Sequence, residues 1–79
     1  MLRRLSELET GEECVVVEIR GKGPVARRIA DMGIIPGARL KVLRRAPLGD
    51  PIELEVRGYN LSLRRSEADL IIVRVVRNA

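Results

Sequence analysis

The chain lacks histidine, tryptophan and phenylalanine, and it has a single cysteine, Cys14, and a single tyrosine, Tyr59. One chain without imidazoles and with one thiol cannot supply the ligands of a tight transition-metal site, so we expect no metal ligands and no bound cofactor. The hydroxyl side chains have no histidine to activate them, and Cys14 has no basic partner at a fixed spacing. The sequence therefore predicts a protein that is not an enzyme, with Cys14 as a small, partly buried strand residue.

Long hydrophobic runs are also missing. No uninterrupted apolar run exceeds four residues, the length reached at 14–17 and 70–73, which is too short for a membrane span. The first residues have no apolar segment of the kind found in secretory signals. A lone cysteine cannot form an intrachain disulfide, so nothing supports an oxidising compartment. We expect a cytoplasmic protein that is not inserted in the membrane.

Basic residues are only moderately in excess of acidic ones: fifteen against eleven give a net charge of +4. Such a balance is compatible with nucleic acid, an anionic membrane surface or an acidic protein. The basic residues are spread along the chain, which favours a solvated surface, although four arginine pairs occur: Arg3-Arg4, Arg27-Arg28, Arg44-Arg45 and Arg64-Arg65. Phosphate contacts by these pairs make a nucleic-acid-binding barrel the alternative function. Nucleic acid is disfavoured, because only Tyr59 could stack on a base.

Aliphatic residues are abundant, and they alternate with polar ones in a way typical of half-buried strands. Strands are predicted at 13–20, 39–45, 52–57, about 61–63 and 70–77, with a loop at 46–51, a turn at 58–60 and one helical turn at 66–69 capped by Ser66. Leu5 and Leu8 precede the first strand and join the core. The residues expected to face inward are Val15, Val17, Ile19, Leu40, Val42, Ile52, Leu54, Val56, Leu61, Leu63, Ile71, Val73 and Val75. Five short strands in 79 residues indicate a single mainly β domain, 1–79, forming a closed or nearly closed small barrel.

Four apolar residues fall on the outward side of these strands: Val16, Leu43, Ile72 and Val76. A solvated face should be more polar, so they could form an interface patch. A homodimer is therefore left open.

A short helix is predicted after the first strand, beginning at Pro24. Pro24 suits the first helical position, while Val25, Ile29 and Met32 share one face. Gly33 suits the left-handed residue after the helix, with Ile34 folding back onto Ile29. Since so short a helix needs support, we expect it to plug one end of the barrel.

The rest of this helix faces solvent, which leaves Arg27, Arg28 and Asp31 as candidate partner contacts. The residues before it, 21–26, match the pattern G-x-G-x-x-A of dinucleotide-binding loops. The chain is too short for a doubly wound nucleotide domain, so we interpret the match as a turn. An anion held by Lys22 and the helix N-terminus is physically allowed.

The loop 46–51, with the sequence APLGDP, is the most informative exposed segment. Its two prolines restrict it, so Leu48 is either folded back on the barrel rim, which we slightly favour, or displayed as an apolar contact for a partner protein. Pro47, Leu48 and Asp50 are therefore candidate partner contacts.

Two segments, ARRIADMGIIPG and APLGDPIELEVRGYNLSLRRSEADLIIV, resemble the FeoA family of small proteins of ferrous iron transport, over about residues 3 to 77. The motifs that carry the resemblance are M-G-x-x-P-G after the helix and A-P-L-G-D-P-I in the loop. The same module is similar to the SH3-like C-terminal domain of iron-dependent repressors, but no helix-turn-helix precedes the barrel here.

The resemblance implies an SH3-like β-barrel that acts as an accessory or regulator of the ferrous iron transporter FeoB, whose cytoplasmic G-protein domain or permease it would bind. It implies binding to FeoB rather than to iron. Gly33, Pro36 and Gly37 are then fold-defining, and the helix surface with Pro47, Leu48 and Asp50 supplies candidate contacts.

Overall fold

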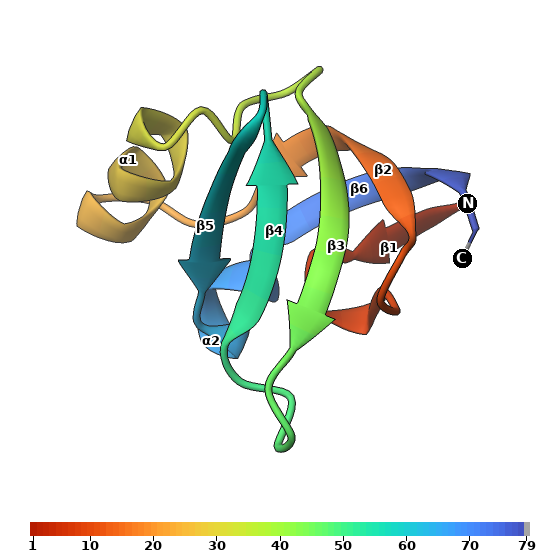
Figure 1. The fold of residues 1–79 in the computed structure, drawn as a ribbon. Helices are drawn as coiled ribbons and strands as arrows, with labels where there is room; N and C mark the ends of the chain where they lie inside the picture. Colours follow the sequence, from red (N-terminus) through yellow and green to blue (C-terminus); the bar gives the residue numbers. More distant parts are fainter. Residues whose placement is uncertain (79) are drawn as a thin grey trace.

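The computed structural model describes residues 1–78 and consists of one curled antiparallel sheet with short helices at its open side (Figure 1). The strands are β1 (Leu2–Arg4), β2 (Glu13–Ile19), β3 (Arg39–Arg45), β4 (Ile52–Val56), β5 (Tyr59–Leu63) and β6 (Ile71–Arg77). The helices are the 3-10 turn η1 (Leu5–Glu7), α1 (Pro24–Asp31) and α2 (Arg65–Ala68). No helix among residues 1–78 has the length and hydrophobicity needed to cross a bilayer.

The strand order is β1-β6-β2-β3-β4-β5, so β1 and β5 are the two ends of the sheet. The mainly β architecture with one short helix after the first long strand is confirmed, but there are six strands rather than about five. The additional strand, β1, pairs with β6 through Arg3 and Val73. Its three residues are too few to show an alternating pattern, which is why the sequence did not indicate it.

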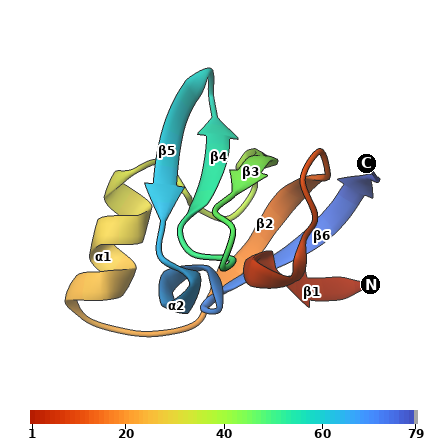
Figure 2. The ribbon, with the colours of Figure 1, turned by 60° about the horizontal axis from the view of Figure 1, so that its bottom comes forward.

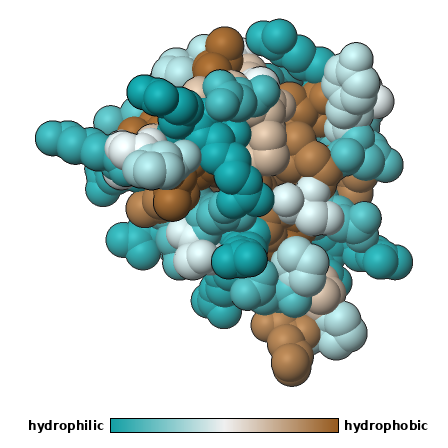
Figure 3. All heavy atoms as spheres, turned by 90° about the vertical axis from the view of Figure 1, so that its left-hand side faces the viewer, coloured by the Kyte–Doolittle hydropathy of each residue, from teal (hydrophilic) through white to brown (hydrophobic). Residues whose placement is uncertain are grey.

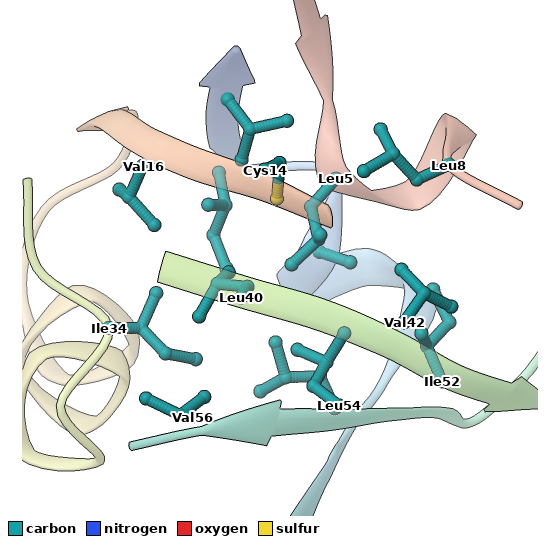
Figure 4. Packing of buried hydrophobic residues seen from close by; sticks show 14 of the residues in the cluster. Leu5, Leu8, Cys14, Val16, Ile34, Leu40, Val42, Ile52, Leu54 and Val56 are labelled. Atoms are coloured by element: carbon teal, nitrogen blue, oxygen red, sulfur yellow. The ribbon is translucent and has the colours of Figure 1, made fainter. Parts of the chain in front are cut away.

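The core lies between the two halves of the curled sheet, where aliphatic side chains from β2, β3 and β4 point toward one another (Figure 4). The inward faces predicted for β3, β4 and the end of β5 are confirmed: Leu40, Val42, Ile52, Leu54, Val56 and Leu63 are all buried. Leu5 and Leu8 are also buried, so η1 contributes to the core as expected.

The predicted orientation of β2 is wrong for its first part, whereas Ile19 packs against the core as expected. Val16, expected to face outward, is 2% exposed, and Cys14 is buried on the same side. Val15 and Val17 are only half-buried on the other face. Two causes combine: three consecutive valines leave the alternation ambiguous, and an irregularity between Val16 and Glu18 shifts the register against β6.

The predicted outward apolar patch is smaller than expected, because Ile72 is also buried. It lies on β6, the strand between β1 and β2, opposite Arg4 on one side and Glu18 on the other. Those neighbours cover it. Val76 remains exposed and Leu43 is half-buried. A homodimer through this face stays a prediction.

Two turn assignments also need correction. The β4–β5 turn consists of Arg57 and Gly58, both with positive φ (52° and 84°), so Tyr59 and Asn60 belong to β5 rather than to the turn. This is the backbone conformation of a two-residue hairpin whose twist matches its strands. Ser66 is not a helix cap, because α2 begins at Arg65, one residue earlier.

The end of α1 is built as predicted. Gly33 has φ of +89°, its N–H donates to Ala30 O at 2.9 Å, and the Ile34 N–H donates to Ile29 O at 3.3 Å. This pair of bonds is a Schellman motif, and the accompanying apolar contact is supplied by Ile29 and Ile34, both fully buried. Val25, however, is 42% exposed, so only the last turn of α1 docks on the core.

Candidate functional site

The candidate contact residues of α1 and of the loop 46–51, called the knob loop below, are joined by α2. Figure 2 shows α2 at the end of the sheet from which the knob loop projects, with α1 beside it. Side chains from both neighbours bind α2, as described below. The two groups of predicted contacts therefore belong to one continuous surface, formed by α1, α2 and the knob loop.

The knob loop is a closed turn. The Gly49 N–H donates to Ala46 O at 2.7 Å, and the Ala46 N–H donates to Pro51 O at 3.1 Å. Pro47 occupies the second position of this turn, where its fixed φ is favourable. Leu48 follows at the tip and is 90% exposed. The slightly favoured interpretation, that Leu48 folds back on the barrel rim, is wrong: Figure 3 shows a hydrophobic projection at the lower end of this face, where the knob loop lies.

Asp50 is exposed, and its carboxylate is bound to the start of α2. Its Oδ1 accepts a hydrogen bond from the backbone N–H of Arg65 at 3.0 Å. This N–H is one of the groups at the start of α2 that has no partner within the helix. Asp50 therefore fixes the knob loop to α2, whereas Pro47 and Leu48 are left to face solvent.

Arg28 connects α1 to α2, because its guanidinium forms an ion pair with Glu67. The other predicted contacts on this helix, Arg27 and Asp31, are exposed, and with Gly23 and Pro24 they line a shallow hollow. The structure thus keeps Arg27 and Asp31 available on the surface and gives Arg28 an internal partner.

Glu67 connects the elements of this candidate surface, and the sequence did not single it out. It is buried, and its Oε1 accepts the Arg64 N–H at 2.9 Å while its Oε2 meets Arg28. A further bond ties the end of α2 to η1, since Ser6 Oγ donates to Asp69 Oδ1. The only local signal is a glutamate three residues after the helix boundary, as in a capping box. Its partner Arg28 is 39 residues away and could not be inferred from sequence.

Among residues 1–78 no three histidine, cysteine, aspartate or glutamate side chains gather as a metal site would require. The thiol of Cys14 is buried in the core, and desolvation, with a smaller contribution from the charge of Glu12, raises its pKa to about 12. A thiol so rarely deprotonated is a poor nucleophile and a poor metal ligand.

The arginine pairs are only partly engaged within the molecule. Arg44 forms an ion pair with Glu53 at 2.8 Å, and Arg45 donates to the carbonyl of Leu8 at 2.9 Å. Arg28 is held by Glu67. Arg27, Arg64 and Arg65 are exposed and form no ion pair within residues 1–78.

Sequence comparison identifies a family and relatives among curated proteins. The model of the FeoA domain matches residues 3–75. A fusion protein of Fe(2+) transport protein A and the Fe(2+) transporter FeoB from Porphyromonas gingivalis is 42% identical over 73 residues, which is 92% of this chain. The chain spans only 9% of that fusion protein.

Solved structures share the fold over almost the whole chain. The FeoA-like protein of Clostridium acetobutylicum superposes with a TM-score of 0.90 at 42% identity, covering 99% of this chain and 91% of that one. FeoA of Stenotrophomonas maltophilia in complex with zinc, described as an SH3 domain protein, gives 0.79 at 28% identity, with 94% and 89% covered. A manganese-dependent transcriptional repressor gives 0.85 at 26% identity, with 95% of this chain but 42% of that one covered.

These matches identify the fold as an SH3-like barrel and confirm the resemblances to FeoA proteins and to one domain of metal-dependent repressors. The family model extends from within β1 to within β6 and includes α1, the knob loop and α2. The chain belongs to the FeoA family.

Proposed function

We propose that this protein is a non-catalytic binding module of ferrous iron transport that docks on the cytoplasmic side of a FeoB-type transporter. The observation that carries the proposal is the relative in which a chain 42% identical to this one is part of the same polypeptide as FeoB. Two modules that are fused in one organism commonly act together when they are separate. Docking on the cytoplasmic G-protein domain or on the permease would place this protein in the cytoplasm.

The geometry supports a role in protein recognition. Leu48 is held at the tip of a closed turn and is 90% exposed, so it is an apolar side chain presented without a contact of its own. Full burial of a leucine in a partner is worth about 1.5–3 kcal/mol. A rigid loop loses little conformational entropy on binding, so most of this free energy is available for association.

The alternative of a nucleic-acid-binding barrel is supported only by exposed arginines without an ion-pair partner, such as Arg64 and Arg65. Arg28 and Arg44 are ion-paired and Arg45 is bound to a backbone carbonyl. Tyr59 is exposed but has no aromatic neighbour, since the chain contains no other aromatic residue. Titration with RNA and DNA at two salt concentrations tests it, because binding driven by phosphate contacts must weaken steeply with salt.

A pull-down and a calorimetric titration with the soluble cytoplasmic domain of the transporter test the proposal. We expect the wild type to bind and Leu48→Asp to weaken binding at least about tenfold, the fold-change of 1.4 kcal/mol. The matched control is Val76→Asp, which places the same charge at another exposed apolar residue, on β6. Binding by Val76→Asp should equal that of the wild type.

Absence of binding by the wild type, together with normal ferrous iron uptake in a deletion strain, would contradict the proposal. Equal affinity of Leu48→Asp and the wild type would remove the knob loop from the contact. Unfolding curves of both variants should coincide with the wild type within about 0.5 kcal/mol, because both residues are on the surface.

A further inference from the structure

Two arginines beside the knob loop have no ion-pair partner in the part of the chain that the structure describes. Arg64 and Arg65 are exposed, and neither side chain forms an ion pair within residues 1–78. The carboxylates around them are engaged elsewhere: Asp50 with a backbone N–H, Glu53 with Arg44, Glu67 with Arg28 and Asp69 with Ser6. The two guanidinium groups are therefore left without a direct ion-pair partner beside the knob loop, although Asp50, bound to a neutral N–H, keeps its negative charge there.

The structure holds these arginines next to Leu48. The backbone N–H of Arg65 is 3.0 Å from Oδ1 of Asp50, two residues after Leu48 in the same loop. Arg64 directly follows Leu63, which pairs with Ile52 at the end of the knob loop. The knob loop and the start of α2 therefore lie at the same end of the sheet, which comes forward in Figure 2.

We propose that Leu48, Arg64 and Arg65 form a single contact, and that its partner is a protein surface with an apolar pocket bordered by carboxylates. Leu48 enters the pocket, and the two guanidinium groups face the acidic border. The proposal rests on the proposed function in naming the transporter's cytoplasmic domain as the protein that carries this pocket, and it adds the chemistry of the site and two residues outside the predicted contacts.

The arrangement fits a protein better than a lipid surface or a nucleic acid. Stable attachment to a membrane requires more buried apolar surface than one leucine side chain provides, even with basic residues beside it. A nucleic acid would use the arginines but offers no pocket for a projecting leucine in its phosphate backbone. A pocket with a charged border uses all three residues, with the leucine determining the dissociation rate and the charges the association rate and salt dependence.

Binding of the intact protein to the soluble cytoplasmic domain of the transporter, measured by biolayer interferometry at two salt concentrations, tests this inference. The variants are Arg64→Gln with Arg65→Gln, which keep the backbone N–H groups of α2 and remove both charges. The control is Arg74→Gln on β6, which removes one exposed charge from another strand.

We expect the double variant to bind about four- to twenty-five-fold more weakly at low salt, or about two- to five-fold per arginine, mainly through slower association. The difference from the wild type should shrink at high salt, because screening removes the same interaction. Arg74→Gln should bind like the wild type.

Each other outcome has a distinct meaning. If the wild type binds and the double variant binds equally well, the partner has no acidic border at this contact. The proposed function is not affected by that result. Absence of wild-type binding removes the proposed function and this inference with it. Binding to vesicles containing phosphatidylglycerol or to duplex DNA, lost in the double variant, in place of binding to the protein domain, also overturns the inference.

Circular dichroism and urea unfolding of the double variant should match the wild type, because both side chains are exposed and their loss leaves the hydrogen bonds of α2 intact. Should the double variant unfold, Arg64→Gln alone, at the residue before α2, provides the same comparison with half the charge change.

Discussion

Arg28 in α1 forms an ion pair with Glu67 in α2, whose side chain is only 7% exposed. The second oxygen of this carboxylate accepts the Arg64 N–H at 2.9 Å. One buried carboxylate therefore connects α1 to α2 and caps the start of α2. The side chain of Arg28 is 56% exposed and keeps much of its hydration, which limits what the ion pair itself contributes. Most of the stabilisation by Glu67 therefore comes from accepting hydrogen bonds from groups that have no other partner.

Glu67→Gln should lower the free energy of unfolding by about 1–3 kcal/mol, because a neutral amide replaces charge-assisted hydrogen bonds at a buried position. Urea denaturation followed by circular dichroism measures the change. Asp31→Asn, at an exposed carboxylate on α1, is the control and should lie within about 0.5 kcal/mol of the wild type. A result for Glu67→Gln inside that same interval would mean that the carboxylate does not support α2.

Gly33→Ala should destabilise the protein by about 1 kcal/mol, because φ is +89° and an alanine there pays the steric cost of the left-handed region. A Cβ at this residue would meet Val56 Cγ1 at 3.8 Å, an ordinary contact, so no packing clash adds to the cost. Thermal unfolding measures the change. Gly33→Asn should cost less, since asparagine tolerates this conformation better; equal costs for the two variants would argue against the backbone explanation.

The neighbours Ile34 and Ile35 should respond differently to truncation. Ile34 is fully buried against Ile29, so Ile34→Ala should cost about 2–5 kcal/mol. Ile35 is 40% exposed, and Ile35→Ala should cost about 1 kcal/mol or less. Paired urea unfolding curves provide the comparison. Similar losses for the two variants would show that the loop after α1 does not dock as described.

Cys14 should resist alkylation by iodoacetamide in the native protein at neutral pH and react on unfolding. Its thiol is buried, and its pKa is raised to about 12, so the thiolate is scarce. The measurement is mass spectrometry of the protein with and without urea. Rapid labelling of the folded protein would contradict the burial of this residue.

Titration of the same thiol should lower the stability of the folded protein at high pH. Because the pKa in the folded protein, about 12, lies above the ordinary value of 9.0, the folded state retains the proton that the unfolded state releases. The contribution of Cys14 is then fully present below pH 9.0 and is lost progressively as the pH rises toward about 12. Comparison with Cys14→Ala over this range isolates the effect, since the alanine variant has no thiol to titrate.

The parts of the fold that depend on neighbouring residues in the sequence could mostly be predicted. The Schellman end of α1 was predictable because Gly33 and Ile34 are adjacent and their roles depend on backbone conformation alone. The alternation in 52–56 was equally clear, since Ile52, Leu54 and Val56 are separated by charged residues. In β2 no charged residues separate the three consecutive valines, so the sequence allowed the opposite orientation.

The candidate surface was predictable only in part. The prolines of the knob loop indicated restricted motion, but whether Leu48 faces the rim or solvent depends on the position of β3 and β4, which no local pattern gives. The role of α2 was missed for the same reason: Glu67 meets Arg28, and Asp50 meets Arg65, only after the barrel has formed. Contacts between residues distant in sequence carry no periodic signal.

The pairing of β1 with β6 brings the start of β1 and the end of β6 to one side of the barrel, away from α1 (Figure 1). A tether attached beside either end would leave α1, α2 and the knob loop unobstructed. In a polypeptide that joins such a module to its target, the encounter becomes intramolecular, and the local concentration set by the linker replaces the concentration in the cell. A contact too weak to persist between separate proteins can then be occupied most of the time.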